Sequence, residues 1–210
     1  MLGHPKDDQT TQVKLDRIVV GNQHGTPNLA ELGWLAGILE GEGSISLVVR
    51  KKSWNGWQGV GVDLNVSFVN TDGFIIEKVV SLLRQIIGSE PHVQGHAPSR
   101  IHKADGTYYQ NVGKTVLYVG VSKMAKIKML LEALIPHMVG EKSARARLMI
   151  DFITRRQGKN GERTKTGASW YGPFDWALVK QFYDLKGKPL PPEVRGLVND
   201  QEQSEPQIAA

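Results

Sequence analysis

The spacing of hydrophobic and polar residues changes repeatedly along this chain, and the changes outline its elements. Apolar residues recur at helical spacing over residues 29–41, then occupy every second position over 44–50 and 60–70. The same two patterns return further on, and they predict helices over 74–87, from about 123 to Pro136 and from 142 or 143 to 155, with strands over 91–96 and 115–121. A turn over 51–59 and a long polar loop over 97–114 separate the strands. The order over 29–155 is therefore α-β-β-α-β-β-α-α, which predicts an α+β fold with an antiparallel sheet backed by helices.

The first helix has an unusual C-terminal end. Asn28 and Glu31 have the spacing of a capping box, which predicts the helix start, and Gly43 is expected to take a left-handed cap at its end. Glu40 and Glu42 lie in the last turn, although a helix C-terminus carries partial negative charge and favours cations. Anionic oxygens gathered against this dipole indicate a site for a hard divalent cation.

The same helix is rich in small residues. Glycine inside a helix costs up to about 1 kcal/mol of helix stability relative to alanine, so three glycines in one helix imply a packing reason. The small residues of this helix form a smooth groove where another backbone can approach. They are Gly33, Ala36, Gly37 and Gly41.

Residues 35–43, LAGILEGEG, resemble the signature of the LAGLIDADG homing endonucleases at every position. Glu replaces Asp at positions 40 and 42, and Gly replaces Ala at position 41. Glu42 in place of the commoner Asp would move the carboxylate oxygens outward by about 1 Å, one methylene. The order of elements over 29–155 also resembles the core of that family, in which a saddle-shaped antiparallel sheet straddles duplex DNA.

The resemblance implies a homodimer, because the chain carries one motif. Two motif helices would pack against each other about a two-fold axis. The residues expected at this interface are Leu32, Gly33, Leu35, Ala36, Gly37, Leu39, Glu40 and Gly41. The two Glu42 carboxylates would then meet, and cations between them would relieve their repulsion. Mg²⁺ is the expected cofactor, with Mn²⁺ as a substitute, and Glu42 and Gly41 are the expected ligands.

Two further catalytic positions follow from the resemblance. The family places a polar or acidic residue at the end of the second strand, and within Asn70-Thr71-Asp72 the spacing to Gly88 favours Asp72. Asp72 fits a helix N-cap equally well. A basic residue after the break between the last core helices is the second position, and Lys142 is the candidate, with a solvated helix-start lysine as the alternative.

Charge is concentrated in the middle of the chain. The net charge is +5, but residues 91–170 hold 14 basic and 5 acidic side chains, a net charge of +9. This distribution predicts a face that binds a polyanion. Polar side chains on the outward face of the strands, and basic or amide side chains in the 97–114 loop, suit base edges and phosphates. The predicted DNA-binding residues are Ser46, Val48, Arg50, Lys52, Asp63, Asn65, Ser67, His92, Gln94, His96, Arg100, Lys103, Asn111 and Lys114.

The composition of the chain predicts its cellular location, and its patterning predicts a division into four segments. The chain has no cysteine, no apolar run long enough to span a bilayer and no signal-peptide core, so we expect a soluble intracellular protein. The expected division is an N-terminal arm over 1–27, the core over 28–155, an extension over 156–198 with a basic loop and one helix over 174–185, and a disordered tail over 199–210.

Two functions fit these features. The first is a metal-dependent, site-specific endonuclease that cuts a long near-palindromic DNA target, and the absence of splicing blocks favours an intron-encoded origin. The alternative is a DNA- or RNA-binding LAGLIDADG protein without cleavage, either an intron maturase with intron RNA as its partner or a transcription regulator. The acid at position 42 favours the endonuclease.

Overall fold

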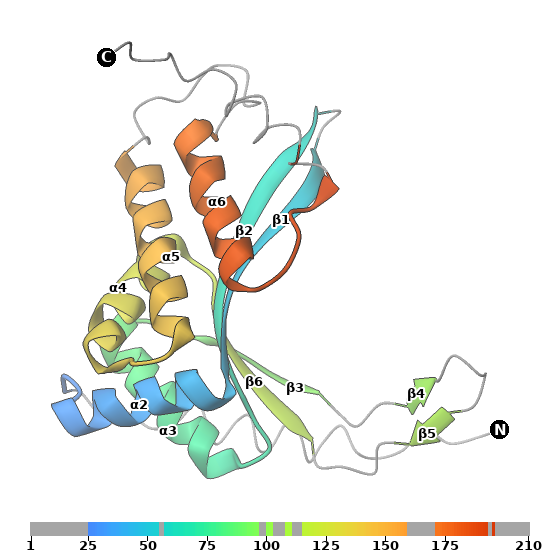
Figure 1. The fold of residues 1–210 in the computed structure, drawn as a ribbon. Coiled ribbons are helices and arrows are strands. Elements are labelled where there is room, and N and C mark those ends of the chain that lie inside the picture. Colours follow the sequence, from blue (N-terminus) through green and yellow to red (C-terminus); the bar gives the residue numbers. More distant parts are fainter. Residues whose placement is uncertain are drawn as a thin grey trace. The chain divides into compact units, whose positions relative to one another are not determined.

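The computed structural model describes residues 25–54, 57–96, 100–102, 108–110, 115–158, 171–192 and 195. The predictions for the N-terminal arm up to residue 24, the basic loop over 159–170 and the tail lie outside the described residues. The elements in chain order are α2 (Leu29–Glu42), β1 (Gly43–Trp54), β2 (Trp57–Asn70), α3 (Gly73–Ile87), β3 (His92–His96), β4 (Arg100–His102), β5 (Tyr108–Gln110), β6 (Val116–Val121), α4 (Met124–Leu134), η1 (Ile135–His137), α5 (Glu141–Gly158) and α6 (Pro173–Leu185) (Figure 1). The predicted α+β class and the order of the core elements are confirmed.

The chain forms two compact units, and both β1 and β2 contribute residues to each. The first unit contains Met1–Ser44 and Val66–Val121, and the second contains Ile45–Asn65 and Ser122–Ala210. The strands are hydrogen-bonded in the order β1-β2-β6-β3. Strand β6 pairs antiparallel with both β2 and β3.

In the first unit, helices α2 and α3 pack together and α3 packs on β6. The end of β2 pairs with β6 from Val66 opposite Val121 to Asn70 opposite Leu117, and β3 lies on the other side of β6 (Figure 1). Alternate strand residues point to the helices and form the core. Its fully buried side chains include Leu35, Leu39, Phe68, Leu83 and Val119.

In the second unit, α5 packs against α4 on one side and α6 on the other (Figure 1). The buried side chains Met149 and Phe152 of α5 and Phe182 of α6 belong to this helical core. The ribbon, which we define as residues 45–54 of β1 and 57–65 of β2, completes the unit. Ile45, Leu47 and Val49 are buried while the residues between them are not, so the predicted alternation of β1 is confirmed.

The capping box at the start of α2 is confirmed, and the predicted cap at its end is wrong. The Asn28 side chain accepts a hydrogen bond from the Glu31 N–H, and the Glu31 carboxylate accepts one from the Asn28 N–H. A hydrogen bond from Lys78 and the one from Asn28 lower the pKa of Glu31. Gly43 has φ −87° and ψ 173°, which is extended backbone and not left-handed, so the helix passes directly into β1.

Position 43 requires a glycine because Leu39 lies very close to its backbone. A Cβ atom at this position would lie 2.5 Å from Leu39 Cδ1 and 2.8 Å from the Leu39 Cα and carbonyl oxygen. The extended chain therefore leaves the helix against its own last turn, and only a glycine fits there.

We expect Gly43→Ala to lower the free energy of unfolding by about 1–3 kcal/mol, the usual cost of overpacking. Chemical denaturation measures this change. Gly73→Ala is the matched control, because a Cβ atom there has nothing within 4 Å. Equal losses in the two variants would contradict this account of Gly43.

Two predictions about the loops are wrong. Residues 51–54 and 57–59, predicted as a turn, belong to β1 and β2, and the loop over 97–114 contains the antiparallel pair β4 and β5. Strands whose residues are mostly polar carry no alternation of apolar positions, so the sequence pattern does not reveal them. Within the described residues, none of the helices has the length and apolar composition needed to cross a membrane.

Candidate functional site

Glu42 lies where a helix becomes a strand without a connecting loop. The N–H of Gly43 donates to the carbonyls of Ile38 and Leu39, which keeps the last turn of α2 closed. Glu42 and the preceding Gly41 are exposed. The last turn contains no basic residue, so the Glu42 carboxylate adds to the negative end of the helix. The junction thus presents anionic oxygen at the surface of the first unit.

Asn70, the last residue of β2, holds the Glu42 side chain. Its Nδ2 donates a hydrogen bond to Oε2 of Glu42. Its Oδ1 accepts a hydrogen bond of 2.8 Å from the N–H of Asp72. The second contact fixes which end of the amide faces the carboxylate, because only the oxygen can accept from an N–H. Asn70 therefore orients one oxygen of Glu42 and leaves Oε1 for another partner.

Asp72 serves as the N-cap of α3. Its Oδ1 accepts from the N–H of Phe74 at 2.8 Å. Within the segment Asn70-Thr71-Asp72, Asn70 is the residue whose side chain contacts Glu42. The helix-cap alternative for Asp72 is confirmed, and its catalytic role stays a prediction.

The exposed face of β3 and β6 carries a cluster of two histidines, a glutamine and a tyrosine. His92, Gln94 and His96 are exposed, as predicted. Tyr118 of β6 pairs with Gln94, and its ring meets the rings of His92 and His96 edge-on at centroid distances of 6.4 and 6.3 Å. Tyr118 was missed because a tyrosine in an apolar strand reads as core.

Ser67 does not lie on an open face, and its prediction as a DNA contact is wrong. The side chain is 3% exposed. Ser67 pairs with Gly120, where an added Cβ atom would lie 2.8 Å from the Tyr118 phenol. The tyrosine therefore packs over this part of the sheet.

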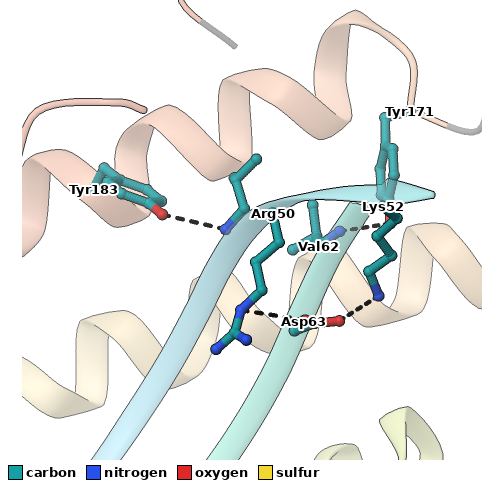
Figure 2. Close-up of polar contacts among 7 residues, drawn as sticks. Arg50, Lys52, Val62, Asp63, Tyr171 and Tyr183 are labelled. Carbon is teal, nitrogen blue, oxygen red and sulfur yellow. Dashed lines mark hydrogen bonds and ion pairs between the residues drawn. The ribbon is translucent and has the colours of Figure 1, made fainter. Parts of the chain in front are cut away.

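The ribbon carries a second charged cluster, in the second unit. Asp63 Oδ1 lies 2.5 Å from Lys52 Nζ, and its Oδ2 lies 3.5 Å from Arg50 Nε (Figure 2). An added Cβ atom at Gly61 would meet the Lys52 side chain at 2.6 Å, so this glycine makes room for the lysine. Each oxygen of Asp63 has one cationic partner, so Asp63 positions both Arg50 and Lys52, and its own contact with DNA stays a prediction. The other predicted ribbon contacts are half-buried, namely Ser46, Val48 and Asn65.

Comparison with known proteins identifies the fold. No protein-family model and no curated protein sequence matches the chain. Among solved structures, the homing endonuclease I-CvuI in complex with the I-CreI target matches with a TM-score of 0.50 and 16% identity, over 84% of this chain and 97% of that one. I-CvuI in complex with its own target gives a TM-score of 0.51 at 16% identity, over 82% and 94%. The LAGLIDADG meganuclease I-CpaMI, bound to uncleaved DNA, gives 0.52 at 11% identity, over 85% of this chain and 51% of that one. This chain has the LAGLIDADG homing endonuclease fold. The resemblance found in residues 35–43 thus extends to the three-dimensional structure.

The LAGLIDADG helix α2 has one face inside the chain and one face outside. Leu35, Ala36 and Leu39 are completely buried, so they pack in the core of the first unit and leave no surface for a second subunit. This corrects their assignment to the interface. The residues of the predicted interface that retain exposure are Leu32, Gly33, Gly37, Glu40 and Gly41. An added Cβ atom at any of the three glycines would find nothing within 4 Å.

The donor set at the end of the LAGLIDADG helix fits a hard cation, but one chain supplies little of it. Glu42 offers a carboxylate and Gly41 is the predicted carbonyl ligand. Within the described residues, no group of three or more His, Cys, Asp or Glu side chains gathers at this or any other place. A carboxylate and a carbonyl oxygen are ligands of the kind that Mg²⁺ takes when phosphate and water complete its shell.

The remaining predicted residues of the LAGLIDADG core lie elsewhere. Lys142 is the second residue of α5 and half-buried, in the second unit. Arg100 starts β4, opposite Gln110. Lys103, Asn111 and Lys114 lie outside the described residues. The roles of these residues stay predictions.

Proposed function

We propose that this protein is a site-specific DNA endonuclease that acts as a homodimer and hydrolyses both strands of a long near-palindromic target with divalent metal ions. The observation that carries the proposal is Glu42, exposed at the end of a LAGLIDADG helix and hydrogen-bonded by Asn70. A protein that only binds DNA has no need of a carboxylate there, because it would repel phosphate.

The chemistry follows from the residues at the junction. Glu42 would supply the anionic ligand, Gly41 a carbonyl oxygen, and Asn70 would keep the carboxylate oriented while DNA enters. A divalent cation held there would make water a better nucleophile and would stabilise the leaving 3′ oxygen. In the proposed hydrolysis a water oxygen would bond to phosphorus as the bond to the 3′ oxygen breaks, and a proton from that water would pass to the 3′ oxygen, so that a 5′ phosphate and a 3′ hydroxyl result. Lys142 is proposed to stabilise the charge that develops.

The homodimer follows from the open face of α2. Among the residues that the structure describes, none lies within 4 Å of a Cβ atom added at Gly33, Gly37 or Gly41, so none explains why these positions are glycine. A second copy of the helix, packed about a two-fold axis, would explain it and would bring a second Glu42 to the first. Each Glu42 would then serve one DNA strand, on half-sites about 10 bp apart from centre to centre.

Each unit offers its own set of exposed polar side chains that we propose to read DNA. The set of the first unit is His92, Gln94 and His96, and the set of the second unit is Arg50 and Lys52. Arginine and lysine suit guanine, and glutamine suits adenine.

Cleavage of a randomised duplex library tests the proposal. The protein is incubated with the library and Mg²⁺, with a parallel reaction in Ca²⁺, and the ends are sequenced. We expect metal-dependent cuts in both strands at one near-palindromic sequence. Enrichment of a bound sequence without cuts in any metal would reject the endonuclease and favour a regulator or maturase, and structured intron RNA would be the next ligand.

A further inference from the structure

We propose that Tyr171 and Tyr183 are positioning residues for DNA sequence discrimination by the ribbon. The inference rests on the proposed function and extends it to a part of the chain beyond the expected core. Tyr171 lies just before α6, and Tyr183 lies in its last turn. Each makes a hydrogen bond to the backbone of one ribbon strand (Figure 2).

The two tyrosines hold opposite strands of the ribbon. The hydroxyl of Tyr183 accepts from the N–H of Val49 in β1 at 3.3 Å, and that of Tyr171 accepts from the N–H of Val62 in β2 at 3.1 Å. In a two-stranded antiparallel ribbon, alternate N–H groups of each strand point away from the partner strand. β1 is an edge strand, and β6 ends opposite Val66, so Val49 and Val62 both have an outer side. The tyrosines thus cap N–H groups on both margins of the ribbon.

The capped positions adjoin the charged cluster. Val49 precedes Arg50, and Val62 precedes Asp63, which holds both Arg50 and Lys52. A strand directs successive side chains to opposite faces, so fixing the backbone at Val49 and Val62 fixes the side from which Arg50 and Asp63 project. Figure 2 shows the two tyrosines flanking the strands that carry this cluster.

Tyr171 is itself firmly anchored. Its ring stacks on Phe152 of α5 at 6.2 Å and contacts Trp176 at 5.0 Å, and the Arg156 guanidinium lies 4.4 Å above it. Arg156 lies 3.7 Å from the fully buried Asp175, which also takes Arg155 Nε at 3.0 Å and accepts from the N–H of Gly172 at 2.8 Å. The hydroxyl therefore projects from a packed group that joins α5 to α6.

These two hydrogen bonds, which hold the ribbon backbone in place, should affect discrimination between DNA sequences more than affinity for DNA. Phosphate contacts tolerate small displacements of a lysine or arginine, whereas contacts to base edges depend on the exact placement of the donor. A ribbon released at one margin keeps its charge and its attraction to DNA. It loses the fixed geometry that separates a correct base pair from a wrong one.

Competition binding with Tyr171→Phe, Tyr183→Phe and the double variant tests the proposal. Phenylalanine keeps the ring and removes only the hydroxyl.

The target positions are located first. The base pairs at which Arg50→Ala loses sequence preference are those that the ribbon reads, and the base pairs at which Gln94→Ala loses preference are those that β3 reads. At the ribbon positions we expect each single variant to lose about threefold to tenfold in the ratio of correct to substituted target, and the double variant to lose more. Discrimination at the β3 positions, affinity for random DNA and the cleavage rate on saturating target should stay within about twofold, since none of them depends on a hydroxyl at the ribbon.

Ile127→Val is the matched control for stability, because Ile127 is fully buried in α4 and its loss of a methylene group removes no hydrogen bond to the ribbon. It should lower stability as the tyrosine variants do and keep the ratio at the ribbon positions. The positioning role of the two tyrosines would be rejected if the double variant kept the ratio of correct to substituted target. It would also be rejected if the ratio fell equally at the ribbon positions and the β3 positions. Absence of sequence-specific DNA binding by the unchanged protein would reject the proposed function itself.

Discussion

The Glu42→Gln variant should bind the selected DNA target as tightly as the unchanged protein and cut it about 10³-fold more slowly or worse. Glutamine keeps the length of the side chain and an oxygen that can accept from Asn70 Nδ2, so the local structure should persist. It removes the negative charge on which a divalent cation depends. Single-turnover cleavage in Mg²⁺ measures the rate, and binding in Ca²⁺ measures affinity separately.

Glu77→Gln is the matched control, because Glu77 is an exposed glutamate of α3 and the chemical change is the same. It should cleave at the unchanged rate. If Glu42→Gln also cleaved normally, Glu42 would not be the metal-binding residue, and another acid would have to be sought.

In the proposed homodimer, Gly37→Leu should separate the subunits into folded monomers and lower cleavage of a near-palindromic target by about 10²-fold. In the described part of the chain a Cβ atom at Gly37 has nothing within 4 Å, so the new side chain starts in open space. Leucine also favours the helix by up to about 1 kcal/mol over glycine. The damage should therefore fall on the approach of a second helix. Sedimentation equilibrium with and without target DNA measures the assembly.

Gly158→Leu provides the comparison, because Gly158 ends α5 and also has open space around it. It should leave the dimer intact. A Gly37→Leu protein that sediments as a dimer and cuts normally would place the subunit contact elsewhere.

The sequence predicts the parts of this fold that rest on apolar periodicity. The alternation over 44–50 gives β1, and the capping box of Asn28 and Glu31 gives the start of α2, because each depends only on neighbours within a few residues. The mostly polar end of the ribbon has no such pattern, so its strands run further than predicted. The extended conformation of Gly43 also escapes prediction, since it depends on contact with Leu39.

The candidate site was predictable in its centre and less so in its surroundings. A motif of nine residues locates Glu42, but the partner that orients it, Asn70, comes from 28 positions away in the chain. The sequence predicts Asp63 as a DNA contact but gives no sign that its carboxylate pairs with Arg50 and Lys52. Long-range contacts of this kind, including those of Tyr171 and Tyr183, leave no trace in local spacing.

The direct passage from α2 into β1 constrains how this protein can change. Because no loop separates Glu42 from the strand, a single inserted or deleted residue there would shift β1 by one position and exchange its two faces. Ile45, Leu47 and Val49 would turn outward, and Arg50 would turn toward the helices. New DNA specificities should therefore arise by exchange of side chains on β1 at constant chain length, and deletions or insertions at this junction should be absent from any functional library.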